Sequence, residues 1–119
     1  MKTVHKLLFL ASLVAWACSS PPQAPNTSIT IAGKLINPEA STINVSLDGD
    51  LAKDSLDSDG NFILRFDYHE TESFMLQSGD LRFSLYLSPG DSIYIMGDAK
   101  EFGETFQAEG SKSLENSYL

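Results

Sequence analysis

Short runs of alternating hydrophobic and polar residues recur from residue 29 onward, separated by residues typical of turns. The clearest pair lies in residues 83–97, where two alternating runs flank Ser88, Pro89, Gly90 and Asp91. Proline presets φ at the second position of a turn, and glycine readily adopts the positive φ that a type II turn needs next. This stretch therefore predicts a hairpin or a sharp strand-to-strand corner, with Pro89, Gly90 and Asp91 as its structural turn residues.

The same alternation predicts an all-β fold, a small antiparallel β-sandwich of about seven short strands. The expected strands cover residues 29–35, 42–48, 51–57, 62–67, 74–77, 83–87 and 92–96. The 51–57 run is more polar than the others, which favours an edge position. The residues expected to face the core are Ile31, Val45, Leu47, Phe62, Leu64, Leu85, Leu87, Ile93 and Ile95. Gly33 indicates a bulge or a close backbone approach in the first strand.

The sandwich is expected to span residues 28–110, with residues 105–108 able to add one more short strand. Serine is a preferred residue at helix N-caps, so Ser113 predicts that residues 111–119 form the start of a helical connector. Such a helix would stop after two turns, as a truncated reading frame would leave it. We therefore expect residues 112–119 to be mobile and their deletion to change stability little.

The N-terminus has the layout of an export signal, with two lysines in residues 1–6 followed by an apolar run over residues 7–17. That run is too short to span a bilayer as a helix. Ala15-Trp16-Ala17-Cys18 resembles a bacterial lipobox, which predicts cleavage between Ala17 and Cys18 and lipidation of Cys18. Residues 18–27 then form a Pro-rich linker that anchors the sandwich to a membrane.

Removal of residues 1–17 leaves six cationic side chains against sixteen acidic ones, a net charge of about −10. Such a surface repels phosphate backbones, so we expect no nucleic-acid binding. Because the chain has a single cysteine, it contains no Cys-x-x-Cys redox or zinc motif and no intrachain disulfide.

Candidate metal and sugar sites are weak. Asp57, Asp59 and Asn61 match the first three ligand positions of an EF-hand loop, but Phe62 stands where glycine is needed. His69 lies beside two glutamates, too few ligands for an ordinary metal site. We therefore predict no metal and no cofactor. Tyr86 and Tyr94 could form a sugar-stacking platform if they share the outer face of a hairpin, but the pattern favours partly buried cross-strand neighbours.

Several of these features occur together in one known family. They are the Cys18 lipobox, the Pro-rich spacer, Ile29-x-Ile31-x-Gly33, Asp59-Gly60-Asn61-Phe62, the segment 85–93 with its Pro-Gly-Asp turn, Phe102 and Phe106, and the ending Glu109-Gly110-Ser111…Asn116-Ser117-Tyr118-Leu119. In this order they resemble the N-terminal β-sandwich domain of TlpA-type, thioredoxin-like thiol-disulfide oxidoreductase lipoproteins of Gram-negative bacteria. The resemblance covers essentially the whole chain.

The resemblance implies a periplasmic lipoprotein whose sandwich is the non-catalytic accessory domain of a redox protein. Because residues 19–25 contain no acidic residue, we expect a periplasm-facing location at the outer membrane rather than surface display, with the outer membrane favoured over the inner. The family's thioredoxin domain and its Cys-x-x-Cys pair are absent from this sequence, so no catalytic residue carries over and we expect no enzymatic activity. The alternative is a stand-alone envelope lipoprotein whose sandwich binds a protein partner or a glycan.

Overall fold

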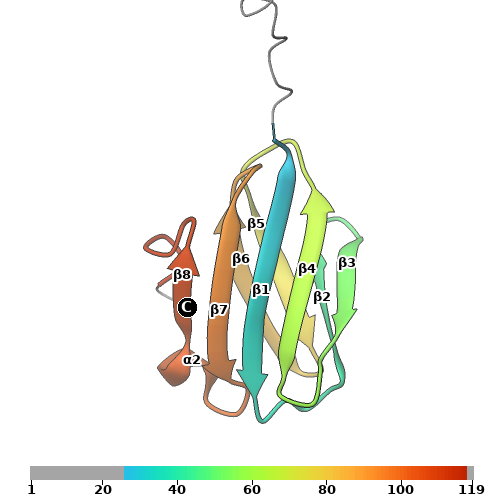
Figure 1. The fold of residues 1–119 in the computed structure, drawn as a ribbon, viewed down its shortest axis with the longest axis vertical. Helices are drawn as coiled ribbons and strands as arrows, with labels where there is room; N and C mark the ends of the chain where they lie inside the picture. The colour runs from blue at the N-terminus through green and yellow to red at the C-terminus, as the bar shows by residue number, and fades with distance from the viewer. Residues whose placement is uncertain (1–25, 118–119) are drawn as a thin grey trace, which may run out of the picture.

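The computed structural model describes residues 26–117, which form two four-stranded β-sheets packed face to face (Figure 1). The all-β sandwich predicted from the alternation is therefore confirmed. Its elements are β1 (Ser28–Ile36), β2 (Thr42–Ser46), β3 (Asp50–Ser55), β4 (Asn61–Asp67), β5 (Glu72–Ser78), β6 (Leu81–Leu87), β7 (Ser92–Asp98), the short helix α2 (Phe102–Thr105) and β8 (Gln107–Gly110).

The first sheet, called here the β1 sheet, has the strand order β4-β1-β7-β8, and the second, the β2 sheet, has the order β3-β2-β5-β6. Only β1 and β7 pair in parallel among the described strands; the other pairs are antiparallel. The polar strand β3 lies at an edge, as expected. The extra strand expected at residues 105–108 is present as β8, shifted by two residues.

The core lies between the sheets and contains fifteen buried hydrophobic residues that come from both. Eight of the nine residues predicted to face inward are among them, and Leu47 is partly buried against the same core. Burying a large aliphatic or aromatic side chain contributes about 1.5–3 kcal/mol. Alternation along each strand is therefore sufficient to specify which face of each sheet is buried.

The Pro-Gly turn is a corner between the two sheets, and the hairpin alternative is wrong. Its geometry is as predicted, since Gly90 has a φ of 89° and Asp91 N–H donates to the Ser88 carbonyl oxygen at 3.0 Å. However, β6 pairs with β5 and β7 pairs with β1. Alternation identifies the inward face of a strand but not its pairing partner, which explains why the sequence left both alternatives open. Tyr86 and Tyr94 consequently lie on different sheets, which excludes a shared sugar platform.

The two sides of the sandwich are closed by different means. Between β3 and β4, the Asp54 carboxylate accepts the Ile63 N–H at 2.8 Å. On the opposite side three aromatic rings from β6 and from the region around α2 pack together, with the Phe83 and Phe102 centroids 4.5 Å apart and Phe106 next to both. The first contact gives a backbone N–H of the edge strand β4 a partner, and the second packs Phe102 and Phe106 against the core.

Residues 111–117 form consecutive turns, and the helix expected to begin at Ser113 is not formed in them. A single helical hydrogen bond joins Asn116 N–H to the Lys112 carbonyl oxygen at 3.0 Å. Asn116 is only 4% exposed, and its side chain donates to the Tyr86 carbonyl oxygen at 2.9 Å and accepts from the Tyr86 N–H at 2.6 Å. The segment is therefore attached to the free edge of β6, which argues against the expected mobility of residues 112–117.

Candidate functional site

The predicted anchor cannot be located in the structure, because Ala17 and Cys18 lie outside the described residues. The described chain enters the sandwich at Asn26 and begins β1 at Ser28, ten residues after Cys18. Among residues 26–117, no helix is long and apolar enough to cross a membrane.

The Pro89-Gly90-Asp91 turn joins three parts of the chain. Asp91 accepts the Ser88 N–H at 2.7 Å and the Lys112 ammonium at 3.0 Å on the same carboxylate oxygen, Oδ2. Its carbonyl oxygen accepts the Thr30 N–H from β1, while Gly90 N–H donates to the Ser28 carbonyl oxygen. The turn therefore has the structural role predicted for it, and its polar groups are used in holding the first strand, the corner and the C-terminal segment together.

Asp57 organises the turn between β3 and β4. Its Oδ1 accepts backbone N–H groups of Asp59 and Asn61, both at 2.9 Å, and its Oδ2 accepts the Asn61 side-chain amide. These bonds, led by the one from the Asn61 backbone, lower the pKa of Asp57 below its ordinary value. Since Asp57 and the Asn61 amide serve the turn itself, the EF-hand-like pattern here is explained by local structure.

His69 lies in the β4–β5 loop, where its Nε2 is 3.4 Å from a Glu70 carboxylate oxygen and both side chains are largely exposed. Its ring stacks on Tyr68 with centroids 4.9 Å apart. No group of three or more potential metal ligands is gathered within residues 26–117.

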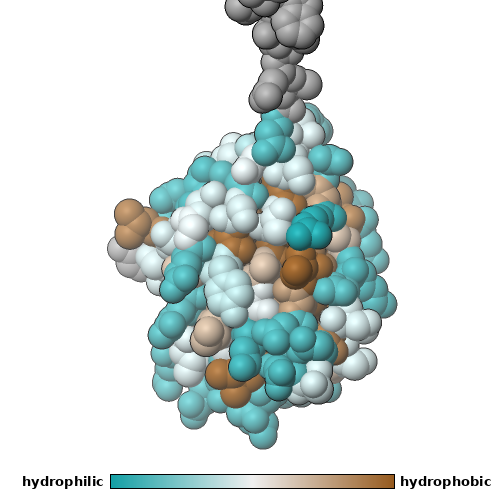
Figure 2. Space-filling model, viewed as in Figure 1, coloured by the Kyte–Doolittle hydropathy of each residue, from teal (hydrophilic) through white to brown (hydrophobic). Residues whose placement is uncertain are grey.

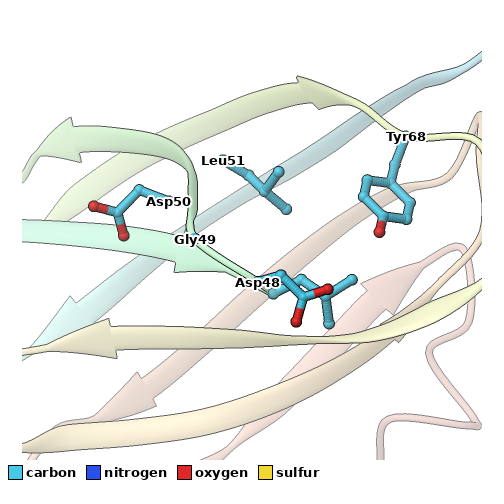
Figure 3. Close-up of a pocket in the computed structure, with 6 residues that line it drawn as sticks. Asp48, Gly49, Asp50, Leu51 and Tyr68 are labelled. Atoms are coloured by element: carbon cyan, nitrogen blue, oxygen red, sulfur yellow. The ribbon is translucent and has the colours of Figure 1, made fainter.

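A shallow hollow of about 220 Å³ lies between the β2–β3 turn and Tyr68 (Figure 3). Leu47, Leu51 and the Tyr68 ring supply its apolar lining, and Asp48 and Asp50 lie in the turn beside it. Figure 3 shows Tyr68 facing the turn from the opposite side of the hollow. Asp50 is partly engaged, since its carboxylate accepts the Asn44 side-chain amide at 3.1 Å.

The surroundings of the Tyr68 phenol favour its neutral form over the phenolate. Loss of solvation raises the pKa of Tyr68 above its ordinary value, and the negative charges of Glu72, Asp48 and Glu70 act in the same direction. The neutral hydroxyl can donate a hydrogen bond, and the carboxylates can accept one. Sequence patterns did not single out Tyr68, because it follows the last residue of β4 and only the three-dimensional fold brings it to the β2–β3 turn.

A second hollow of about 230 Å³ lies on the other side of Tyr68, lined by Thr27, Asp67, Tyr68 and His69. Tyr68 N–H donates to the Thr27 carbonyl oxygen at 3.1 Å, and the Thr27 hydroxyl donates to Asp67 at 3.2 Å. Both hollows therefore lie at the end of the sandwich where the linker enters. Their chemistry suits a small cationic or hydrogen-bond-donating group, and none of these residues forms a catalytic constellation.

Comparison with known proteins gives a distant structural likeness. No family model matches the chain, and no curated protein matches it. The N-terminal domain of AlgF from P. aeruginosa superimposes with a TM-score of 0.46 at 20% sequence identity, covering 74% of this chain and 98% of that domain. A likeness at this level does not bear on function, and nothing in it tests the resemblance to TlpA-type proteins.

Proposed function

We propose that this chain is a lipid-anchored protein of the bacterial cell envelope, in which the β-sandwich acts as a non-catalytic domain held at the membrane through Cys18. The observation that carries the proposal is the position of the single cysteine, between an apolar run with small residues at its end and a Pro-rich spacer. An unpaired cysteine in an exported protein needs a role, and thioether lipidation supplies one.

The spacer fits this role. Residues 19–27 are polar and Pro-rich, and in an extended conformation nine residues reach roughly 28 Å at about 3.1 Å each. The linker enters the sandwich beside Asp67 and close to Asp48, so this end of the domain is acidic. Acidic side chains are repelled by anionic headgroups, which favours a sandwich that stands away from the membrane surface.

The anchor is tested with Cys18→Ala in the full chain, expressed in its native cells, with Ser19→Ala as the matched control. One acyl chain binds a membrane only marginally and two bind stably, so removal of the acylation site should release the protein. We expect wild type and Ser19→Ala in the membrane fraction and Cys18→Ala in the soluble envelope fraction. A wild-type protein that is soluble, and that carries no lipid by mass spectrometry, would contradict the proposal.

Two candidate functions of the β-sandwich are compatible with a lipid-anchored envelope protein. The resemblance to TlpA-type oxidoreductases supports an accessory domain of a redox protein, and sequencing the reading frame past Leu119 for a Cys-x-x-Cys domain tests it. A stand-alone binding module is favoured by a different observation. Hydrophobic side chains are exposed on the outer face of the β1 sheet, including Ile63 at 47% and Ile36 at 43%.

A further inference from the structure

We propose that Asp48 is a site of spontaneous covalent modification, at which the exposed β2–β3 turn converts aspartate to isoaspartate through a succinimide. The sequence contains two Asp-Gly pairs, Asp48-Gly49 and Asp59-Gly60. The fold leaves the first pair able to react and protects the second. This inference goes beyond the proposed function, and it does not depend on how Cys18 is processed.

The reaction needs a carboxyl group and the peptide nitrogen that follows it. The nitrogen of Gly49 attacks Cγ of Asp48, an N–Cγ bond forms, and the N–H proton leaves with the carboxyl hydroxyl as water. A second water then opens the five-membered ring. Addition at Cγ restores aspartate, whereas addition at the main-chain carbonyl carbon breaks the original peptide bond and leaves the chain joined through Cγ. One water is lost and one is gained, so the reaction needs no oxidant, cofactor or enzyme.

Glycine after the aspartate favours this step, because it has no Cβ beside the attacking nitrogen. It also lets the backbone rotate into conformations that bring the nitrogen close to the carboxyl carbon. Both Asp-Gly pairs share this chemistry in the unfolded chain. A difference between them in the native protein therefore comes from the fold.

The first pair lies in an open part of the molecule. Asp48 and Gly49 are both exposed, and a Cβ at Gly49 would meet no atom of the described residues within 4 Å. Within the same range, residues 26–117, neither the Asp48 carboxylate nor the Gly49 N–H takes part in a hydrogen bond or ion pair. The Leu47 N–H donates to the Gly49 carbonyl oxygen at 3.1 Å, a bond that uses neither reacting group.

Water, the second reactant, can reach this turn. Figure 3 shows Asp48 and Gly49 beside the hollow that lies between the turn and Tyr68. The hollow is at the end of the sandwich where the linker enters, and Figure 2 shows mainly hydrophilic surface around that entry. The succinimide formed here would therefore be open to hydrolysis.

The second pair is fixed on both sides of its peptide bond. The Gly60 N–H, which carries the attacking nitrogen, donates to the Asp57 carbonyl oxygen at 3.0 Å, and the Gly60 carbonyl oxygen accepts the Leu35 N–H at 2.9 Å. The Asp59 N–H donates to Oδ1 of Asp57 at 2.9 Å. Gly60 is also buried, and a Cβ there would collide with the Leu35 carbonyl oxygen. The nitrogen of Gly60 is therefore unavailable unless the β3–β4 turn opens.

Isoaspartate at position 48 would change the β2–β3 turn. The main chain gains one carbon atom and the side chain loses one, so the carboxylate lies closer to the backbone. The bond between Leu47 and Gly49 spans the modified residue, and Asp50, which accepts the Asn44 side-chain amide at 3.1 Å, follows it. Isomerisation therefore alters the acidic rim of the hollow without changing the mass of the protein.

The test is peptide mapping of the protein purified from its native cells and incubated for a long period in mildly acidic buffer. Electron-transfer fragmentation distinguishes isoaspartate from aspartate, and synthetic peptides with isoaspartate at position 48 or 59 establish that both products are detected. We expect isoaspartate to form at position 48 about tenfold faster than at position 59, or more. This factor corresponds to about 1.4 kcal/mol for opening the protected turn.

Unfolding the protein provides the matched control. In urea the two Asp-Gly pairs should react at similar rates, because the contacts that protect Gly60 are lost. Asp48→Glu should abolish the product at position 48, since glutamate would have to form a six-membered ring, and it should leave position 59 unchanged. Asp59→Glu should leave the product at position 48 unchanged.

Three results would overturn the inference: no isoaspartate at position 48 in the folded protein, equal rates at positions 48 and 59 in the folded protein, or the same ratio of rates in folded and unfolded protein. The last result would assign the difference to neighbouring residues in the sequence instead of to the fold. None of these outcomes depends on the membrane fractionation of Cys18→Ala, so the anchor and the modification site succeed or fail separately.

Discussion

Gly33 is the residue at which the β1 sheet tolerates no side chain. It is buried in β1, between Phe62 of β4 and Ile95 of β7, and a Cβ there would collide with the Ile95 carbonyl oxygen. Of the two alternatives that the sequence left open, a bulge or a close backbone approach, the structure has the close approach. The backbone oxygen belongs to a paired strand and cannot move aside without disturbing the sheet.

Gly33→Ala should therefore lower the free energy of unfolding by about 1–3 kcal/mol or more, the usual cost of overpacking a core. Gly103→Ala is the matched control, because a Cβ at Gly103 would meet no atom within 4 Å. The control should be neutral or stabilising by up to about 1 kcal/mol, since alanine reduces the entropy of the unfolded chain. Urea denaturation of both variants measures the difference. Equal stability of the two would contradict the steric argument.

Asp57 should contribute to the pH dependence of stability. Hydrogen bonds from Asn61 and Asp59 lower its pKa below the ordinary 3.8, so the unfolded chain binds this proton more readily than the folded chain. The stabilisation is therefore present above about pH 3.8 and is lost as the pH falls through the lower pKa of the folded state.

Asp57→Asn should make the free energy of unfolding less dependent on pH below 3.8. Asp59→Asn is the control, because in the described residues Asp59 contributes its backbone N–H to the turn and no side-chain hydrogen bond. Thermal unfolding from pH 2.5 to 6 provides the measurement. If the Asp57 and Asp59 variants have the same pH profile as wild type, the turn does not contribute in this way.

At the scale of elements, the C-terminal segment acts as a cap on the edge of β6. The Asn116 side chain pairs with both backbone groups of Tyr86, as a neighbouring strand would, and it also donates to the Lys112 carbonyl oxygen at 2.9 Å. Lys112 in turn pairs with Asp91 at 3.0 Å, with both side chains mostly buried. A chain ending before residue 112 would lose all of these contacts.

We therefore expect deletion of residues 112–119 to lower the free energy of unfolding by about 2–3 kcal/mol, on the basis of about 0.5–1.5 kcal/mol per hydrogen bond and more for a charged pair. Asn116→Ala alone should cost about 1–2 kcal/mol. Glu115→Ala, at an exposed neighbouring position, should stay within about 0.5 kcal/mol of wild type. A deletion that leaves the urea midpoint unchanged would restore the expectation that this segment is dispensable.

The strands could be predicted from the sequence because a two-layer fold buries one face of each strand. That burial requires hydrophobic and polar residues to alternate, and the alternation is visible in the local sequence. It left the pairing of β6 and β7 undecided because a Pro-Gly turn is compatible with both a hairpin and a corner. The helix expected at Ser113 failed for a tertiary reason, since Asn116 is used to pair with Tyr86. The hollow at Tyr68 and the placement of Ala32 between Ile63 and Tyr94 depend on strand order, which alternation does not encode.

At the scale of the whole molecule, the buried hydrophobic side chains lie between the two sheets, and the charged side chains of the described residues lie outside them. Many acidic residues lie in turns at the ends of the sandwich, as at Asp48 and Glu70, while the outer face of the β1 sheet carries Lys34 and Arg65 together with Asp67, Asp98 and Glu109. The linker enters at one acidic end, so a tether there leaves the broad faces accessible.

The family resemblance raises the question of whether this chain catalyses thiol–disulfide exchange. We predict that it does not. Catalysis of thiol–disulfide exchange needs an activated thiolate and usually a second, resolving thiol. Cys18 is the only cysteine in the sequence, and in the proposed mature protein its sulfur is bonded to lipid. Purified mature protein should therefore reduce insulin no faster than the dithiothreitol background. Reduction above that background by wild type, lost in Cys18→Ala, would show that Cys18 is a free and reactive thiol, and it would contradict both this prediction and the anchor.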